Sequence, residues 1–139
     1  MVGYPLATLL RDGLLDVGEW VDFDLIIGEF LWQMRGYGIS DKWVLISMKS
    51  ALKDNSPWLR NMGIEIKKGL GTGKYFVRVT EVFRDRWAIR FVRELSPDII
   101  NDLIDKKSKS KRRYDPNFRL TQKFVSLRHV HLVEGGGTR

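Results

Sequence analysis

The chain has 139 residues, of which 43% are hydrophobic and none is cysteine, so it can form one packed domain but no disulfide, thiol nucleophile or cysteine-ligated zinc site. Its formal net charge is +7. It has no run of about 18 apolar residues, and its first residues lack the basic flank and small-residue cleavage site of a secretory signal. These features predict a cytoplasmic protein.

The positive charge is concentrated in the second half of the chain. Residues 1–60 hold six Lys and Arg against eight Asp and Glu, a net charge of −2, whereas residues 61–139 hold 18 against nine, a net charge of +9. Basic side chains that displace counterions from phosphates gain affinity for nucleic acid without reading its sequence. The composition therefore favours nucleic acid as the partner, and the alternative is a basic surface without a ligand.

Two helices are predicted before residue 40. PLATLLRDGLL at 5–15 has its leucines on one side. DLIIGEFLWQMRGYG at 24–38 carries a helical stripe of apolar residues, with Asp22 or Asp24 as its N-cap, and the two glycines of RGYG are placed to end it. The acidic stretch DVGEWVDFD between the two helices is predicted as a connector.

Two more helical segments follow. SDKWVLISMKSALK at 40–53 predicts a helix capped by Ser40, although WVLIS taken alone is also typical of a strand. SPWLRNMG at 56–63 predicts a short helical turn that Gly63 closes.

After residue 63 the apolar period changes from 3.6 to 2, which indicates strands. IEIKK (64–68) and KYFVRVTEVF (74–83) are predicted as two strands joined by the turn GLGTG, and WAIRFVREL (87–95) as a third strand. A helix is predicted at 96–105, and a last strand or strand pair at 118–133.

The predicted fold class is α+β, in which N-terminal helices precede a β-hairpin and a small antiparallel sheet. We expect an N-terminal helical segment at 1–21, a central domain at 22–95, and a C-terminal helix, basic linker and strand at 96–139. The linker contains KKSKSKRR at 106–113, which has six basic residues and no apolar one and is therefore expected to be disordered by itself.

The stretch GLGTGK at 69–74 resembles a phosphate-binding loop but fails its pattern. Such a loop needs a second glycine followed by Lys and then Ser or Thr, whereas Gly73 and Lys74 are followed by Tyr75, and Lys68 stands where the first glycine is needed. A helix should also follow, and YFVRVTEVF alternates like a strand. The glycines are better explained by a hairpin turn, because glycine tolerates positive φ angles.

Residues 22–79 resemble a winged-helix domain in the order of their elements. DLIIGEFLWQMRGYG takes the place of the first helix, SDKWVLISMKSALK and SPWLRNMG that of the helix-turn-helix pair, and IEIKKGLGTGKYFVRV that of the wing. In that family a recognition helix enters the major groove and the wing contacts the DNA backbone or minor groove. The resemblance implies a non-catalytic protein that binds nucleic acid, with double-stranded DNA favoured, and no metal or cofactor.

The resemblance also assigns candidate DNA contacts. Arg60 and Asn61 would read bases, since arginine can bond guanine and asparagine adenine. The remaining candidates are basic residues expected at phosphates, from the helix at 40–53, the wing and the linker: Lys49, Lys53, Lys67, Lys68, Lys74, Arg78, Lys106, Lys107, Lys109, Lys111, Arg112 and Arg113.

A metal-dependent nuclease is one alternative. Glu65 and Lys67 form a Glu-x-Lys pair on a predicted strand, as in PD-(D/E)xK nucleases, and Asp54 and Glu29 complete a possible set of carboxylates. The sequence departs from that family because no Pro-Asp pair precedes the strand and Asp54 follows a helix.

Two further alternatives remain. His129 and His131 would point the same way on a strand, as metal ligands do, and resemble the His-hydrophobe-His motif of rolling-circle nicking enzymes. The protein could instead be a small viral or mobile-element inhibitor that binds another protein. For such an inhibitor, the leucine-rich N-terminal segment would offer a surface for a homodimer or a protein partner.

Overall fold

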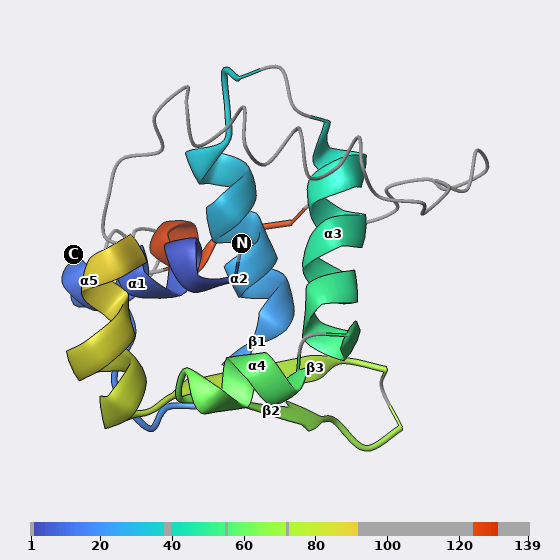
Figure 1. The fold of residues 1–139 in the computed structure, drawn as a ribbon. Helices are drawn as coiled ribbons and strands as arrows, with labels where there is room; N and C mark the ends of the chain where they lie inside the picture. Colours follow the sequence, from blue (N-terminus) through green and yellow to red (C-terminus); the bar gives the residue numbers. More distant parts are fainter. Residues whose placement is uncertain (1, 38–39, 55, 72, 92–123, 131–139) are drawn as a thin grey trace, which may run out of the picture.

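The computed structural model describes residues 2–37, 40–54, 56–71, 73–91 and 124–130, and these form helices stacked on a small antiparallel sheet (Figure 1). The predicted α+β class is confirmed at this level. In chain order the elements are α1 (Gly3–Arg11), β1 (Val21–Asp22), α2 (Phe23–Gln33), α3 (Asp41–Asp54), α4 (Ser56–Asn61), β2 (Ile64–Lys68), β3 (Tyr75–Val79), the π-helical turn η1 (Phe83–Trp87) and α5 (Ala88–Phe91).

Helix α2 runs through the centre of the described core. Its N-cap is Asp22, whose carboxylate accepts a hydrogen bond of 2.9 Å from the backbone amide of Asp24. The predicted apolar stripe is confirmed, since Ile26, Ile27 and Phe30 have no exposed surface. The helix ends at Gln33, earlier than the sequence suggested.

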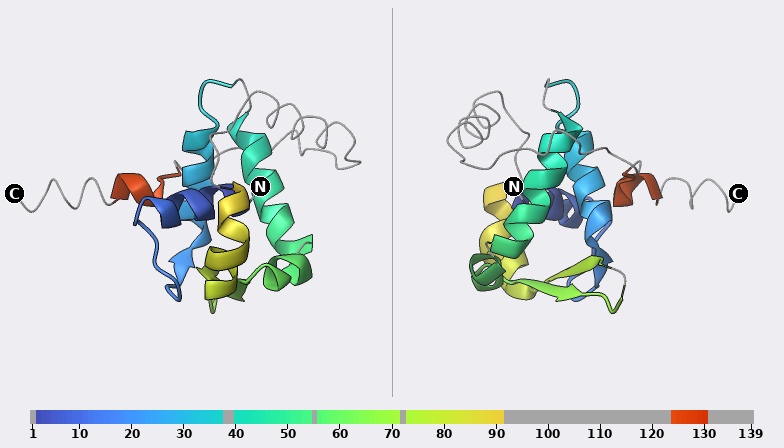
Figure 2. Two further views of the ribbon diagram at one scale, coloured as in Figure 1. Left: turned by 60° about the vertical axis from the view of Figure 1, so that its left-hand side comes forward. Right: turned by 90° about the vertical axis from the view of Figure 1, so that its right-hand side faces the viewer.

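Helices α3 and α4 lie where the sequence predicted helical segments. The amide of Trp43 donates a hydrogen bond of 3.2 Å to the hydroxyl of Ser40, so Ser40 caps α3 as expected. The apolar face of α3, including Met48 and Leu52, is buried. Helix α4 crosses the end of α3 and is followed by Gly63, which has φ = 87° (Figure 2).

The sheet has the order β1-β3-β2, with all neighbours antiparallel. Strand β3 is central, so Val77 pairs with Val21 of β1 on one side and with Ile66 of β2 on the other. The predicted turn between the two strands is confirmed by a hydrogen bond of 2.8 Å from the amide of Gly69 to the carbonyl of Lys74. Strand β1 was not predicted, because it lies in the stretch expected to be a connector.

The strand predicted at 87–95 is wrong where the structure describes it. Strand β3 ends at Val79, and the chain then forms η1 and α5. Phe91 of α5 packs against Tyr4 of α1 at a ring separation of 5.2 Å and stacks on Phe83 at 6.3 Å. This segment is helical because it covers the open side of α1, not an edge of the sheet.

The C-terminal predictions are only partly covered by the structure. The helix expected at 96–105 and the basic segment at 106–113 lie outside the described residues. Within the strand expected at 118–133, residues 124–130 are described, and 127–130 form a helical turn, so the strand prediction is wrong there. Among the described helices, none is long and apolar enough to cross a membrane.

Gly63 should tolerate substitution poorly, because it combines a positive φ with close neighbours. A Cβ added there would lie 2.5 Å from the Thr80 hydroxyl and 2.7 Å from the backbone nitrogen of Phe83, besides imposing a positive φ on a side chain. We expect Gly63→Ala to lower the free energy of unfolding by about 2–4 kcal/mol in urea titrations. Gly71→Ala, with φ = 70° and no atom within 4 Å of the added Cβ, should cost only about 1 kcal/mol. Equal losses would contradict the steric argument.

Candidate nucleic-acid interface

The predicted contact residues that the structure describes come from three elements at one end of the molecule. The last turns of α3, helix α4 and the β2–β3 hairpin all lie at this end (Figures 1 and 2). The exposed members of the set are Lys49, Lys53, Arg60, Asn61, Lys67, Lys68 and Lys74, and Arg78 is half-buried. The predicted contacts from Lys106 to Arg113 lie outside the described residues. We call this end of the molecule the hairpin end.

Two of these cations are held by carboxylates. Lys74 Nζ lies 3.3 Å from Asp22 Oδ2, and the Arg78 guanidinium binds Glu65 Oε2, with Nε at 3.0 Å. Both pairs are partly solvated, so each is worth less than about 1 kcal/mol and can exchange for a phosphate.

The other cations of the hairpin end have no such partner. In the described ranges, no carboxylate lies within ion-pair distance of Lys49, Lys53, Arg60, Lys67 or Lys68. An exposed cation that forms no ion pair keeps most of its attraction for a polyanion, although the Asp24 carboxylate partly offsets the charge of Lys49. These side chains therefore form the part of the predicted set that is available to phosphates.

Asp24 links α3 to the hairpin electrostatically. Burial, and then the neighbouring Asp22 carboxylate, raise the pKa of Asp24 above its ordinary value of 3.8. The charges of Lys49 on α3 and Lys74 on the hairpin act in the opposite direction on this pKa. Asp24 thus reduces the positive potential between the two elements.

One face of the sheet is turned away from the core and carries a second group of side chains. We call it the outer sheet face, and it comprises Trp20, Asp22, Glu65, Lys67, Phe76 and Arg78. Lys67 Nζ lies 4.5 Å from the centroid of the Trp20 ring, and the Arg78 guanidinium lies 4.4 Å from it. Both distances are within the range of cation–π contacts.

Trp20 was missed in the sequence because its stretch was assigned to a connector. The residue directly precedes Val21 and Asp22, which form β1, so it continues the line of that strand beside Arg78. The one signal in the sequence was an aromatic residue two positions before Asp22, on the same side of an extended chain.

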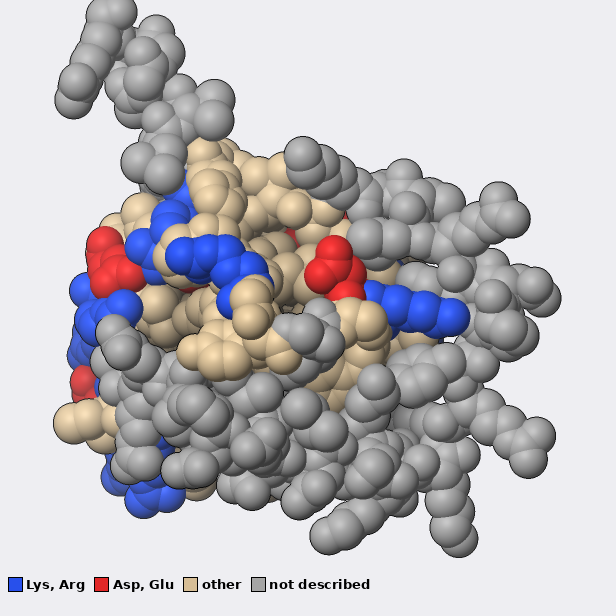
Figure 3. Space-filling model, turned by 90° about the horizontal axis from the view of Figure 1, so that it is seen from above, with Lys and Arg blue, Asp and Glu red and all other residues tan. Residues whose placement is uncertain are grey.

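The opposite end of the molecule has a mixed surface. Seen from above, Lys and Arg side chains lie beside Asp and Glu side chains on its described part (Figure 3). At the end of α1, Arg11 binds Asp12 at 2.9 Å, and the hydrogen bond from Arg11, together with Arg128 nearby, lowers the pKa of the Asp12 carboxyl. Because carboxylates lie among the cations there, this end is the weaker candidate for binding a polyanion.

Two of the carboxylates of the nuclease hypothesis bind arginines. Glu65 binds Arg78, and Glu29 is fully buried and binds Arg128. The side chain of Asp54 lies outside the described part of the structure. Within that part, no three His, Asp or Glu side chains are close enough together to hold a metal ion.

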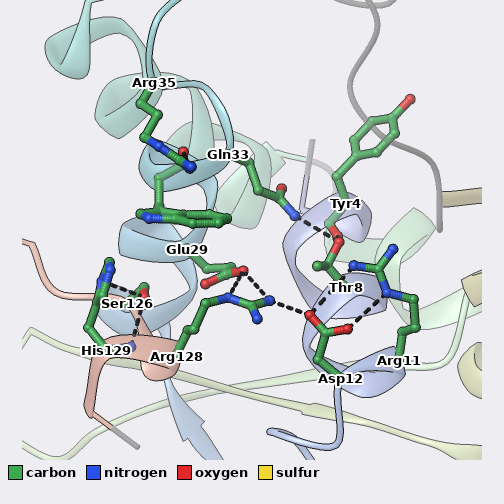
Figure 4. A network of polar contacts seen from close by, with 11 residues as sticks. Tyr4, Thr8, Arg11, Asp12, Glu29, Gln33, Arg35, Ser126, Arg128 and His129 are labelled. Atoms are coloured by element: carbon green, nitrogen blue, oxygen red, sulfur yellow. Dashed lines mark hydrogen bonds and ion pairs between the residues drawn. The ribbon is translucent and has the colours of Figure 1, made fainter. Parts of the chain in front are cut away.

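The Glu29 carboxylate joins the C-terminal segment to the helices (Figure 4). Arg128 donates to Glu29 Oε1 at 3.1 Å and also binds Asp12, which lies just past the end of α1. Residues 124–130 lie so close to α2 that a Cβ at Gly28 would meet the carbonyl oxygen of Val125 at 2.5 Å. The network is therefore a structural link between three parts of the chain.

His129 belongs to the same link. Its Nδ1 lies 2.9 Å from the hydroxyl of the buried Ser126, and its ring packs edge-on against Trp32 at a centroid distance of 6.2 Å. His131 lies outside the described residues. The described histidine thus has a packing role, on a helical turn and not on the strand that the metal hypothesis required.

The leucine-rich N-terminal segment is largely part of the core. Leu6 and Leu9 have no exposed surface, while Leu10 and Leu14 are half-buried. The side chains left at the surface therefore offer a smaller partner interface than the sequence suggested.

Comparison of the chain with protein-family models, with curated proteins and with solved structures gives no match.

Removing Arg128 should destabilise the fold strongly. Arg128→Met leaves the buried Glu29 carboxylate without its cation, so we expect a loss of about 3–5 kcal/mol of unfolding free energy. The double variant Glu29→Leu/Arg128→Met should recover most of that loss, because apolar side chains replace both charges. Arg11→Met, which breaks only an exposed pair with Asp12, should cost less than about 1 kcal/mol. A double variant no more stable than Arg128→Met would contradict this view of the link.

Proposed function

We propose that the protein binds nucleic acid through the hairpin end, with double-stranded DNA as the favoured target, and that it does so without catalysis. The observation that supports this most directly is the group of exposed cations without carboxylate partners, which comes from three successive elements at one end of the molecule. Such cations bind phosphates by displacing condensed counterions.

The order of elements supports a winged-helix-like mode. Helices α3 and α4 act as the helix-turn-helix pair, and the β2–β3 hairpin acts as the wing. Arg60 and Asn61, on the last turn of α4, are exposed and have the donor groups that read guanine and adenine. Lys53 at the end of α3 and Lys68 at the end of β2 flank them in sequence and bind the backbone.

In this arrangement different elements provide affinity and sequence preference. Contacts from Lys53 and Lys68 to phosphates set affinity and position, and contacts from α4 to base edges set any sequence preference. Helix α4 has six residues, so it reaches few base pairs, and most of the binding free energy comes from the backbone contacts.

The first test compares two triple variants that remove the same charge. Lys53→Gln/Arg60→Gln/Lys68→Gln takes one cation from each element of the hairpin end. We expect it to weaken binding to duplex DNA and to reduce the slope of log affinity against log salt by roughly 2–3, about one per lost contact. The measurement is fluorescence anisotropy over a series of salt concentrations.

The matched control is Arg35→Gln/Arg86→Gln/Arg90→Gln, whose exposed arginines lie after α2, in η1 and in α5. It should leave both affinity and slope nearly unchanged. Equal losses in the two variants would mean that net charge and not the hairpin end drives binding, and a salt-independent affinity would remove the polyanion hypothesis.

A second test uses Asp24. Because this carboxylate lies near Lys49 and Lys74, Asp24→Asn should raise the affinity for duplex DNA about twofold to fivefold. Wild-type affinity should likewise rise as pH falls through the raised pKa of Asp24, and the variant should lack that part of the rise. Asp41→Asn, at the first turn of α3, removes the same charge at the other end and should have little effect on affinity. An equal gain from Asp41→Asn would contradict the local argument.

A further inference from the structure

Two aromatic rings of the outer sheet face are not used by the core. Trp20 and Phe76 are half-buried, yet neither is among the apolar side chains that pack against the buried core. Phe76 lies on the central strand, paired with Asp22 of β1 on one side and with Lys67 of β2 on the other. The two rings therefore lie on the solvent side of the sheet, where Lys67 and Arg78 contact the Trp20 ring.

The charges around these rings are unevenly balanced. Asp22 binds Lys74 and Glu65 binds Arg78, so both carboxylates of this face are engaged. Lys67 has no carboxylate within ion-pair distance in the described part of the chain. It lies 4.5 Å from the Trp20 ring centroid and 6.0 Å from that of Phe76. The face therefore combines aromatic rings with one cation that is open to an anion.

The contacts of Lys67 and Arg78 with Trp20 also restrict the ring. An indole held against two cations loses less conformational entropy when a ligand stacks on it than a freely rotating one would. A shallow hollow of about 400 Å³ adjoins Arg78 and Glu65 and is lined in addition by Val17, Gly18, Thr80 and Glu81. The outer sheet face is thus preorganised and has room next to it.

We infer that the outer sheet face binds unpaired nucleotides, whose bases stack on Trp20 and Phe76 while Lys67 contacts the backbone phosphate. Aromatic side chains beside cations are the surface that single-stranded nucleic acid requires, since every base has a π-face and each link carries a phosphate. This inference rests on the proposed function and specifies its target as a duplex with a single-stranded extension.

The placement of the outer sheet face supports a junction as the target. Lys67 lies on this face and its neighbour Lys68 on the other side of β2, and both belong to the cations of the hairpin end. Because Lys67 and Lys68 are adjacent in the chain, a DNA strand that leaves a duplex bound at the hairpin end meets the outer sheet face one residue away. A protein partner would instead need an apolar surface without an open cation at its centre.

The test measures the affinity of the full chain for DNAs that share one duplex sequence. The first DNA is a blunt duplex. The second carries a short single-stranded extension of thymidines, tested both as a 5′ and as a 3′ extension. The third carries the same extension with abasic sites in place of the thymidines. Wild-type protein should prefer the thymidine extension over the blunt duplex by roughly fivefold or more per stacked base, and the abasic extension should give little of that gain.

Trp20→Leu should remove the preference for the extension and leave affinity for the blunt duplex unchanged, while Trp20→Phe should keep part of it. Trp58→Leu, which alters an exposed tryptophan of α4, should keep the preference in full. Urea unfolding of each variant identifies any loss of fold. A further variant, Lys67→Gln, leaves both rings in place and should weaken the preference for the extension.

Two results overturn the inference. If wild-type protein binds blunt and extended duplexes equally, or if Trp20→Leu keeps the preference, the rings do not stack on bases, and the proposed function stands alone. If no DNA binds at any salt concentration, the proposed function and the inference fail together.

Discussion

Strand β3 is the element on which the proposed site depends, because it hydrogen-bonds to β1 on one side and to β2 on the other. The alternation of a strand then determines where each side chain goes. Val77 and Val79 are buried in the core, whereas the alternate residues Phe76 and Arg78 face outward. A register shift of one residue would exchange the two sets and expose valines where the aromatic and basic side chains now lie. The core and the candidate interface are thus specified by the same five residues.

The helical part of the core depends on a different constraint, the buried carboxylate of Glu29. A fully buried charge on α2 needs a cation, and Arg128, about one hundred residues later in the chain, supplies it. This contact brings residues 124–130 against Gly28 and also binds Asp12 after α1. Both ends of the intervening chain are thereby attached to the same helical core, and the surface of the hairpin end stays clear of residues 124–130.

The helices and the hairpin could be predicted because local signals agreed there with tertiary packing. For α2, the capping residue Asp22 and the apolar stripe both specify the helix, and for the hairpin the glycines and the period of 2 both specify the turn. The segment that begins at Trp87 was predicted as a strand because the pattern of WAIRFV is compatible with either a strand or a helix. A strand would place Trp87, Ile89 and Phe91 on one side, but Ile89 is 76% exposed while the two rings pack inward. Strand β1 has only two residues, too few to show an apolar period. The sequence therefore did not place Trp20, which directly precedes β1, beside the sheet.

The charge asymmetry of the sequence is not a division of the molecule in space. The acidic first half supplies Lys49, Lys53 and Arg60 to the hairpin end, and it also supplies Asp22 and Asp24, which lie next to cations. Net charge along the chain therefore overstates the positive potential near β1 and understates it near α4. What decides whether a polyanion is bound is which cations lack a carboxylate neighbour, and this follows from strand pairing and helix placement. On that criterion Lys67 and Lys68, adjacent in sequence but on opposite sides of β2, connect the proposed duplex contacts to the outer sheet face.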